Sequence, residues 1–329
     1  MRHNVRTFDL FTAVLAVVGC LFAGNAHAQD AQDYPSKPIR IIAPVPPGGA
    51  VDALARIVAE KLREKWSQAV ITENRDGAAG NIGAEAVFRA EPDGYTLLLT
   101  AGGVLVTNKM LYAKLTYDPE AFVPVSVVAA NYSVLIVHPR IAAESLQQFI
   151  AFAKANPGRL DYASPGTGSG SHLTAELFKY VTGIDMLHVP YKGGAPALVA
   201  VISGQVPVNF GELGSVLPHV RAGKVRALAI TSKMRNPSLP NVPTVSEVLP
   251  GFLATPWNGA VAPPGTPTAI ANKLSTAIAE ALKQPDVAKR LLDRNFETIG
   301  STPAEMALFL KQERERWGNL IRAIGVKAD

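Results

Sequence analysis

The segment that decides the fold is IRIIAPVPPGGAVDALARIVAEKL, residues 39–62. It opens with an apolar, β-branched run at residues 39–43, which prolines bound on both sides and which is typical of a buried strand. A turn with two prolines and two glycines follows. Apolar residues then recur at helical spacing from Leu54 to Trp66, with charged residues on the opposite face. The segment therefore predicts a strand, a glycine turn and an amphipathic helix.

Strand and helix patterns continue to alternate along the chain. Residues 69–72 complete a βαβ unit, whose crossover is expected to be right-handed. Further strands are predicted at 95–100, 160–163, 186–189, 206–210 and 225–230, and helices at 146–155, 173–181, 268–283 and 303–323. This alternation predicts an α/β protein with doubly wound sheets. About 300 residues is long for one core, so two lobes are expected with a ligand cleft between them.

The lobe boundaries follow from the same patterns. Residues 134–252 carry their own run of strands and helices, and the proline-rich stretch 237–267 resembles a return path into the first lobe. We therefore expect residues 29–133 and 253–329 to form lobe 1, and residues 134–252 to form lobe 2.

Residues 1–28 have the pattern of a secretory signal peptide. A positively charged start precedes an apolar core, and Ala26-His27-Ala28 is an A-x-A cleavage site. Cleavage after Ala28 predicts an exported, periplasmic protein. The alternative is a lipoprotein with a lipidated Cys20, but the residues after Cys20 stay apolar, which favours one continuous signal core.

Composition excludes several classes of function. Cys20 is the only cysteine, so the mature chain is expected to have no disulfide and no thiol chemistry. The formal charge of +5 falls to +4 after cleavage, which suits a small anionic ligand. No Lys/Arg run is present, so nucleic acid is not an expected partner.

Two glycine-rich turns are the candidate binding elements. The first glycine loop, residues 44–52, leads into a helix whose N-terminal amides attract a carboxylate or phosphate. Its alternative interpretation is a plain tight turn in which Asp52 caps its own helix. The second glycine loop, residues 164–172 (SPGTGSGSH), also joins a strand to a helix. It lacks the dinucleotide and P-loop patterns. Two such loops suggest one bridged ligand, and a dicarboxylate is the natural match.

Enzymatic patterns are weak. Ser171 and His172 are neighbours, but no G-x-S-x-G nucleophile elbow is present. No H-x-x-x-H or H-E-x-x-H pattern occurs, so no metal site is expected. His188 is interpreted as a hydrogen-bonded strand histidine rather than a base.

The chain resembles the Bug-type solute receptors of tripartite tricarboxylate transporters. The resemblance rests on YPSKPIRIIAPVPPGGAVDALARIVAEKL, ENRDGAAGNIGAEAV, PDGYTLLL, ANPGRLDYASPGTGSGSHLTAELF, HVPYKGGAPALVAVISGQV, LPHVRAGKVRALAITS, LPNVPTVSE and APPGTP, in family order. It implies a periplasmic Venus-flytrap protein of two α/β lobes that delivers a carboxylate to a membrane permease. Family ligands are carboxylated metabolites or aromatic acids.

The resemblance places the expected ligand contacts on four segments. By position they are Val45, Pro47, Gly48, Gly49, Ala50, Val51, Asp52, Thr100, Gly102, Ser164, Gly166, Thr167, Gly168, Ser169, Ser171, His172 and Glu212. The sequence departs from the family pattern at four places. Val45 stands where phenylalanine is frequent, Val51 where Ser or Thr is common, Gly211 where an acidic residue is frequent, and Asn258 within the family's Trp-Phe-Gly. The Gly211 departure bears on the recognition of an amino group, and together the departures predict a pocket that is roomier on one side and differently polar on the other.

We therefore predict a monomeric carboxylate receptor without catalytic activity, cofactor or metal, whose partners are a small carboxylated ligand (a mono- or dicarboxylate or an aromatic acid) and the permease. The alternatives are a periplasmic hydrolase on a two-lobed α/β scaffold and a ligand-presenting partner of a sensor kinase.

Overall fold

A computed structural model of the protein describes residues 33–328. The predicted signal peptide, the cleavage after Ala28 and the alternative lipidation at Cys20 lie outside the described residues. Residues 37–328 belong to one compact unit. Within the described range, every helix is too short or too polar to span a lipid bilayer.

A six-stranded sheet has the order β11-β4-β10-β3-β1-β2. Its strands are β1 (Ile39–Ala43), β2 (Val70–Asn74), β3 (Thr96–Ala101), β4 (Val123–Asn131), β10 (Trp257–Ala262) and β11 (Phe296–Thr298). β1 runs parallel to β2 and β3, whereas β10 is antiparallel to both β3 and β4, and β11 is antiparallel to β4. The sheet is therefore mixed.

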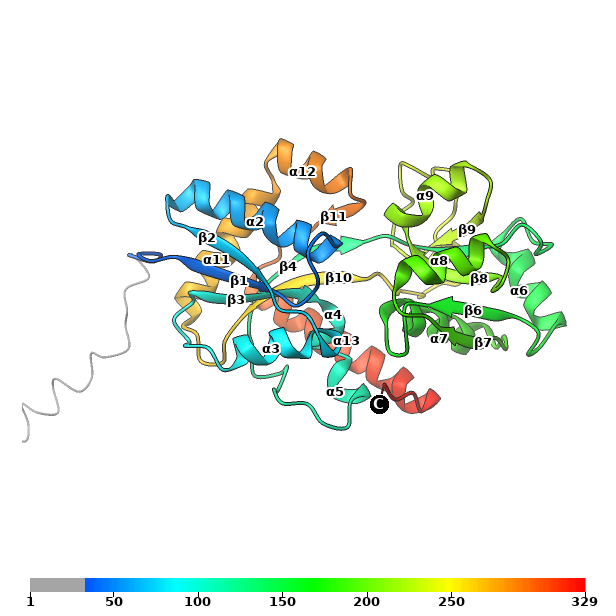
Figure 1. The fold of residues 1–329 in the computed structure, drawn as a ribbon, viewed down its shortest axis with the longest axis horizontal. Helices are drawn as coiled ribbons and strands as arrows, with labels where there is room; N and C mark the ends of the chain where they lie inside the picture. Colours follow the sequence, from blue (N-terminus) through cyan, green and yellow to red (C-terminus); the bar gives the residue numbers. More distant parts are fainter. Residues whose placement is uncertain (1–32, 329) are drawn as a thin grey trace, which may run out of the picture. The chain divides into compact units, whose positions relative to one another are not determined.

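Helices cover both faces of this sheet. They are α2 (Ala50–Trp66), α3 (Asn81–Phe88), α4 (Gly102–Leu105), α5 (Asn108–Leu111), α11 (Thr268–Leu282), α12 (Pro285–Leu292) and α13 (Pro303–Ile324), with a short 3-10 turn, η1, at Ala78–Gly80. Figure 1 shows α2 on one face and α3 on the other. α2 buries the apolar face that its sequence predicts, including Leu54, Ile57 and Leu62, so burial of that stripe fixes the helix on the sheet.

A five-stranded sheet has the order β7-β6-β8-β5-β9. Its strands are β5 (Ser133–Val137), β6 (Asp161–Ser164), β7 (Leu187–Pro190), β8 (Val208–Glu212) and β9 (Arg226–Ile230), and its helices are α6 (Leu146–Ala155), α7 (Gly170–Thr182), α8 (Gly194–Ile202), α9 (Leu213–Arg221) and α10 (Val245–Val248). β6 is parallel to β7 and β8, and β5 is antiparallel to β8 and β9. Figure 1 shows α8 and α7 on opposite faces.

The chain passes from one sheet to the other at two places. Tyr132 alone separates β4 of the first sheet from β5 of the second, and residues 231–256 return the chain from β9 to β10. β10 lies within the stretch that the sequence predicts as a return path. All six of its residues are buried, because it is inserted between β3 and β4.

Candidate functional site

The first glycine loop is held in shape by Asp52. The Asp52 side chain is buried, and its Oδ2 accepts hydrogen bonds from the Gly48 amide at 2.9 Å and from Arg56 Nε at 3.1 Å. Its Oδ1 accepts from Asn74 Nδ2 at 2.9 Å. Burial alone would raise the pKa of Asp52, but these hydrogen bonds outweigh it and lower the pKa. Gly49 precedes α2 and no side chain caps the helix, so Asp52 fixes the loop and does not cap α2.

The rest of the first glycine loop faces solvent. Pro47, Gly48 and Gly49 are exposed, and Val45, Ala50 and Val51 are partly exposed. Gly48 has a φ of +87°, whereas Gly49 has an ordinary φ of −78°. The loop thus presents backbone that a ligand can approach.

At the end of β3, one predicted contact is buried and the other underlies a tryptophan. Thr100 is 1% exposed, and its Oγ1 has no hydrogen-bond partner among the described residues. A Cβ added to Gly102 would lie 2.4 Å from Cε2 of Trp257. The absence of a side chain at Gly102 therefore allows the Trp257 indole to lie against the start of α4.

The second glycine loop is stabilised by its own hydroxyls. Ser169 is the N-cap of α7: its Oγ accepts from the His172 amide at 3.3 Å and donates to the Gly166 carbonyl at 2.7 Å. Ser164 Oγ accepts from the Gly166 amide at 3.1 Å. The first-turn amides of α7, at Gly170 and Ser171, have no acceptor within the helix and lie at its positive end. They are suitable donors for an anion.

Two stacked histidines support this loop from within. The rings of His172 and His188 are 4.0 Å apart between centroids, and His188 Nε2 lies 2.7 Å from Ser164 Oγ. His172 is 3% exposed, and its Nδ1 accepts from the Gly168 amide at 2.9 Å. Burial and the neighbouring His188 lower the pKa of His172 to about 4. His172 is therefore uncharged at neutral pH, and His188 is a hydrogen-bonded strand histidine, as interpreted from the sequence.

Ser171 and Glu212 have different environments. Ser171 Oγ donates to the Phe210 carbonyl at 2.7 Å, so its hydroxyl is already used within the protein. Glu212 ends β8 with an exposed side chain, yet desolvation by the surrounding protein raises the pKa of its carboxyl.

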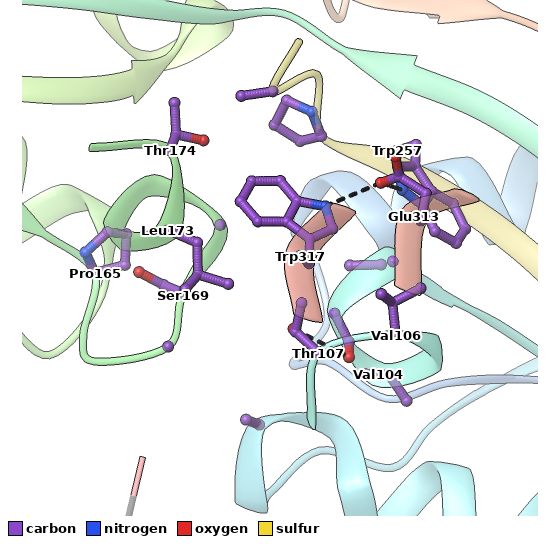
Figure 2. A pocket seen from close by; sticks show the side chains of 18 of the residues that line it. Val104, Val106, Thr107, Pro165, Ser169, Leu173, Thr174, Trp257, Glu313 and Trp317 are labelled. Atoms are coloured by element: carbon purple, nitrogen blue, oxygen red, sulfur yellow. Dashed lines mark hydrogen bonds between the residues drawn. The ribbon is translucent and has the colours of Figure 1, made fainter. Parts of the chain in front are cut away.

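A pocket of about 330 Å³ brings part of the predicted site together (Figure 2). Among the described residues, it is lined by Ala79, Ala101, Gly102, Gly103, Val104, Val106, Thr107, Tyr112, Pro165, Gly166, Thr167, Gly168, Ser169, Gly170, Leu173, Thr174, Ala254, Thr255, Pro256, Trp257, Glu313 and Trp317. Five predicted contacts are in this set, namely Gly102, Gly166, Thr167, Gly168 and Ser169. The predicted contacts of the first glycine loop are not in the set, and neither are Thr100, Ser164, Ser171, His172 and Glu212.

One wall of the pocket consists of residues that the sequence analysis missed. Glu313, on α13, is 4% exposed, and its Oε2 accepts from Trp257 Nε1 at 3.0 Å and from Trp317 Nε1 at 3.1 Å. Its Oε1 pairs with Arg316. We call Trp257, Glu313 and Trp317 the tryptophan wall. The i, i+4 spacing of Glu313 and Trp317 could have indicated that these two side chains lie on the same face of a helix. No local sequence pattern, however, links them to Trp257.

The described residues include no group of three or more His, Cys, Asp or Glu side chains placed to hold a metal ion.

Comparison with known proteins decides the family. The model of the tripartite tricarboxylate transporter family receptor matches residues 54–326. The chain belongs to this receptor family. The resemblance read from its motifs is thus confirmed, and the family is one of solute receptors rather than enzymes.

Relatives and solved structures agree over nearly the whole receptor. Protein BugT of Bordetella pertussis is 38% identical over 321 residues, which cover 96% of this chain and 98% of BugT. A solved R. palustris protein, Rpa4515 with adipate, is 34% identical with a TM-score of 0.78 and covers 90% of this chain and 99% of its own. MatC from Rhodopseudomonas palustris with bound malate is 32% identical with a TM-score of 0.74. This match covers 88% of the present chain and 100% of MatC. The predicted two-lobed α/β fold is confirmed.

Proposed function

We propose that this receptor captures a carboxylated small molecule in the periplasm and delivers it to the membrane permease of a tripartite tricarboxylate transporter. The observation that carries the proposal is the composition of the pocket. The second glycine loop and the start of α7 line it, whereas none of its described lining residues is Lys, Arg or His. Backbone amides at a helix N-terminus can hold a carboxylate without a cationic side chain.

The solved structures support this ligand class. Adipate and malate, which are named with Rpa4515 and MatC, are both carboxylates. We propose that the ligand's carboxylate binds at Gly166–Gly170, and that Gly102 contributes to the opposite side of the pocket. The exposed part of the first glycine loop and Glu212 would contact any portion of the ligand that extends beyond the pocket.

A hydrolase is the competing function, and one contact favours it. Ser164 Oγ lies 2.7 Å from His188 Nε2, which is the separation of a nucleophile and its base. However, Ser164 is fully buried and does not line the pocket, so a substrate could not reach its hydroxyl. We therefore propose a receptor without catalytic activity. Absence of ester turnover by the mature protein is the expected result.

We further propose that lobe 1 comprises residues 29–133 and 253–329, that lobe 2 comprises residues 134–252, and that the mature protein is a monomer beginning at Gln29. The sheets support this division to within one residue, because strands of the six-stranded sheet come from residues 39–131 and 257–298 and those of the five-stranded sheet from 133–230, so that Ser133 at the start of β5 belongs with lobe 2.

The proposed function is tested by thermal unfolding of the mature protein with a panel of mono-, di- and tricarboxylates. A ligand at a hundred times its Kd stabilises the folded state by about 2.7 kcal/mol. For about 300 residues this corresponds to a Tm rise of about 4 °C. At least one carboxylate should give such a rise and remain chemically unchanged. No rise with any member of the panel would refute the proposal.

A further inference from the structure

The tryptophan wall uses all of its polar groups internally. Both indole N–H groups donate to Glu313 Oε2, and Arg316 pairs with Oε1. An indole has one donor and no acceptor. Trp257 and Trp317 therefore have no hydrogen-bonding group left for a ligand, and the surface that they present to the pocket is carbon.

The lining of the pocket around the wall is mostly apolar. Val104, Val106 and Leu173 line the same pocket, and Figure 2 shows the benzene ring of Trp317 directed toward Leu173 and Thr174 while its N–H faces Glu313. This part of the pocket can accept a flat, apolar group by stacking or edge contact with the indole.

Charge at the wall acts against a second carboxylate. Glu313 is the only Asp or Glu among the described lining residues, and no Lys, Arg or His accompanies it there. Arg316 and Lys233 line an adjoining cavity of about 280 Å³, which shares Thr255, Trp257 and Glu313 with this pocket, and they are not among the residues that line the pocket itself. A ligand carboxylate near the wall would therefore lie beside the like charge of Glu313, whose paired cation, Arg316, lines the adjoining cavity and not the pocket.

We propose that this receptor selects ligands with one carboxylate and a flat, uncharged body, with the carboxylate on Gly166–Gly170 and the body against Trp317. This rests on the proposed function. Trp317 is the specificity-determining residue, and Glu313 is a positioning residue that orients both indoles. The selection differs from that of Rpa4515 and MatC, because adipate and malate, named with those structures, each have two carboxylates.

The test is calorimetric titration of the mature protein with four probes that separate body shape from charge. Benzoate and benzene-1,4-dicarboxylate share a ring, whereas hexanoate and adipate share a six-carbon chain. Benzoate is expected to bind at least about tenfold more tightly than each of the other three, because it alone combines a flat body with a single charge.

Two variants connect this preference to the wall. Trp317→Leu should weaken benzoate binding about 10- to 100-fold, whereas Trp66→Leu, which changes the tryptophan at the end of α2 outside the pocket, should leave it unchanged. Glu313→Gln removes the charge but keeps an acceptor for the indoles. It should narrow the ratio of benzoate to benzene-1,4-dicarboxylate affinity by about tenfold, and a purely structural role for Glu313 would not change that ratio.

The outcomes separate the two proposals. Adipate or the aromatic dicarboxylate binding as tightly as benzoate would overturn the selection while leaving the carboxylate receptor intact. An unchanged preference in either Trp317→Leu or Glu313→Gln would also overturn it. If Trp317→Leu does not fold, the ratio of benzoate to benzene-1,4-dicarboxylate affinity measured in Glu313→Gln still tests the selection. Failure of all four probes, together with the wider carboxylate panel, would refute the proposed function itself.

Discussion

Replacing Gly102 by alanine should disturb the tryptophan wall directly. The new Cβ would lie 2.4 Å from Cε2 and 2.7 Å from Nε1 of Trp257, closer than van der Waals contact allows. The indole is buried and its N–H is held by Glu313, so either the ring or the backbone must shift. Overpacking costs about 1–3 kcal/mol, and a weakened hydrogen bond to a charged group costs about 1.5–3 kcal/mol. The two costs do not simply add, because a shift of the indole that relieves the overpacking weakens its hydrogen bond to Glu313. We therefore expect a loss of about 2–4 kcal/mol in the free energy of unfolding.

Gly103→Ala is the matched control, because it makes the same change one residue later in α4. Its Cβ would meet Thr107 Oγ1 at 3.4 Å, an ordinary contact. We expect it to be neutral or to stabilise the protein by up to about 1 kcal/mol, as alanine does in a helix. Urea unfolding followed by far-UV circular dichroism measures both variants. Equal unfolding free energies, within about 0.5 kcal/mol, would refute the close packing of Trp257 on Gly102.

Three further predictions follow from local geometry. Gly49→Val should fold normally, because its Cβ meets only the Pro46 carbonyl at 3.8 Å, whereas Gly48→Val should be strained by its φ of +87°. The carboxylate affinity of the stable Gly49→Val protein is then measured by calorimetry. A reduced affinity would place Gly49 in the site, and an unchanged affinity would remove it from the site. The pKa of His172, about 4 in the folded protein, is below the value of about 6.5 expected when unfolded. The unfolded state therefore takes up the proton first as the pH falls. The contribution of His172 to the free energy of unfolding is then fully present above about pH 6.5 and decreases toward pH 4, by up to about 3 kcal/mol. Urea unfolding at several pH values should show this loss, and the loss should be smaller in His172→Asn; an equally steep loss in the variant would contradict the prediction. Gly211→Asp should destabilise the fold by about 1–3 kcal/mol, because its Cβ would lie 2.6 Å from Val216 Cγ1 and 2.8 Å from Asn209 Oδ1. A Tm equal to that of the unmodified protein would show that this loop can relax.

The sequence was informative where a local pattern determines the structure. The strand at residues 39–43 and the helix after it have the predicted positions, because an apolar run between prolines and a 3.6-residue repeat need no distant partner. It was less informative at residues 123–131, where no strand was predicted and β4 forms. The chain divides at Tyr132 into β4 and β5, which join different sheets, and β5 begins one residue before the predicted start of lobe 2. The partners of these two strands depend on long-range pairing, which no local pattern shows.

The candidate site shows the same limit. Glycines and hydroxyls marked the second glycine loop, and five of the predicted contacts line the pocket. The tryptophan wall could not be predicted, because Trp257 and Glu313 are 56 residues apart and meet only through the packing of α13 near β10. The roles of His172 and Ser171 also depended on tertiary contacts, since burial makes the histidine neutral and a β8 carbonyl takes the serine hydroxyl.

The central claim is that the receptor recognises a carboxylate through backbone amides. The most direct measurement is calorimetric titration of the mature protein with the carboxylate that raises Tm most in the panel, beside its primary amide, which has a similar shape but no charge. The account predicts one ligand per protein, an affinity nearly constant from about pH 6 to pH 8, and binding of the amide weaker by about 10- to 100-fold. Equal affinity for the carboxylate and its amide, or a steep loss of carboxylate affinity above about pH 6.5 as a charged histidine would give, would contradict it.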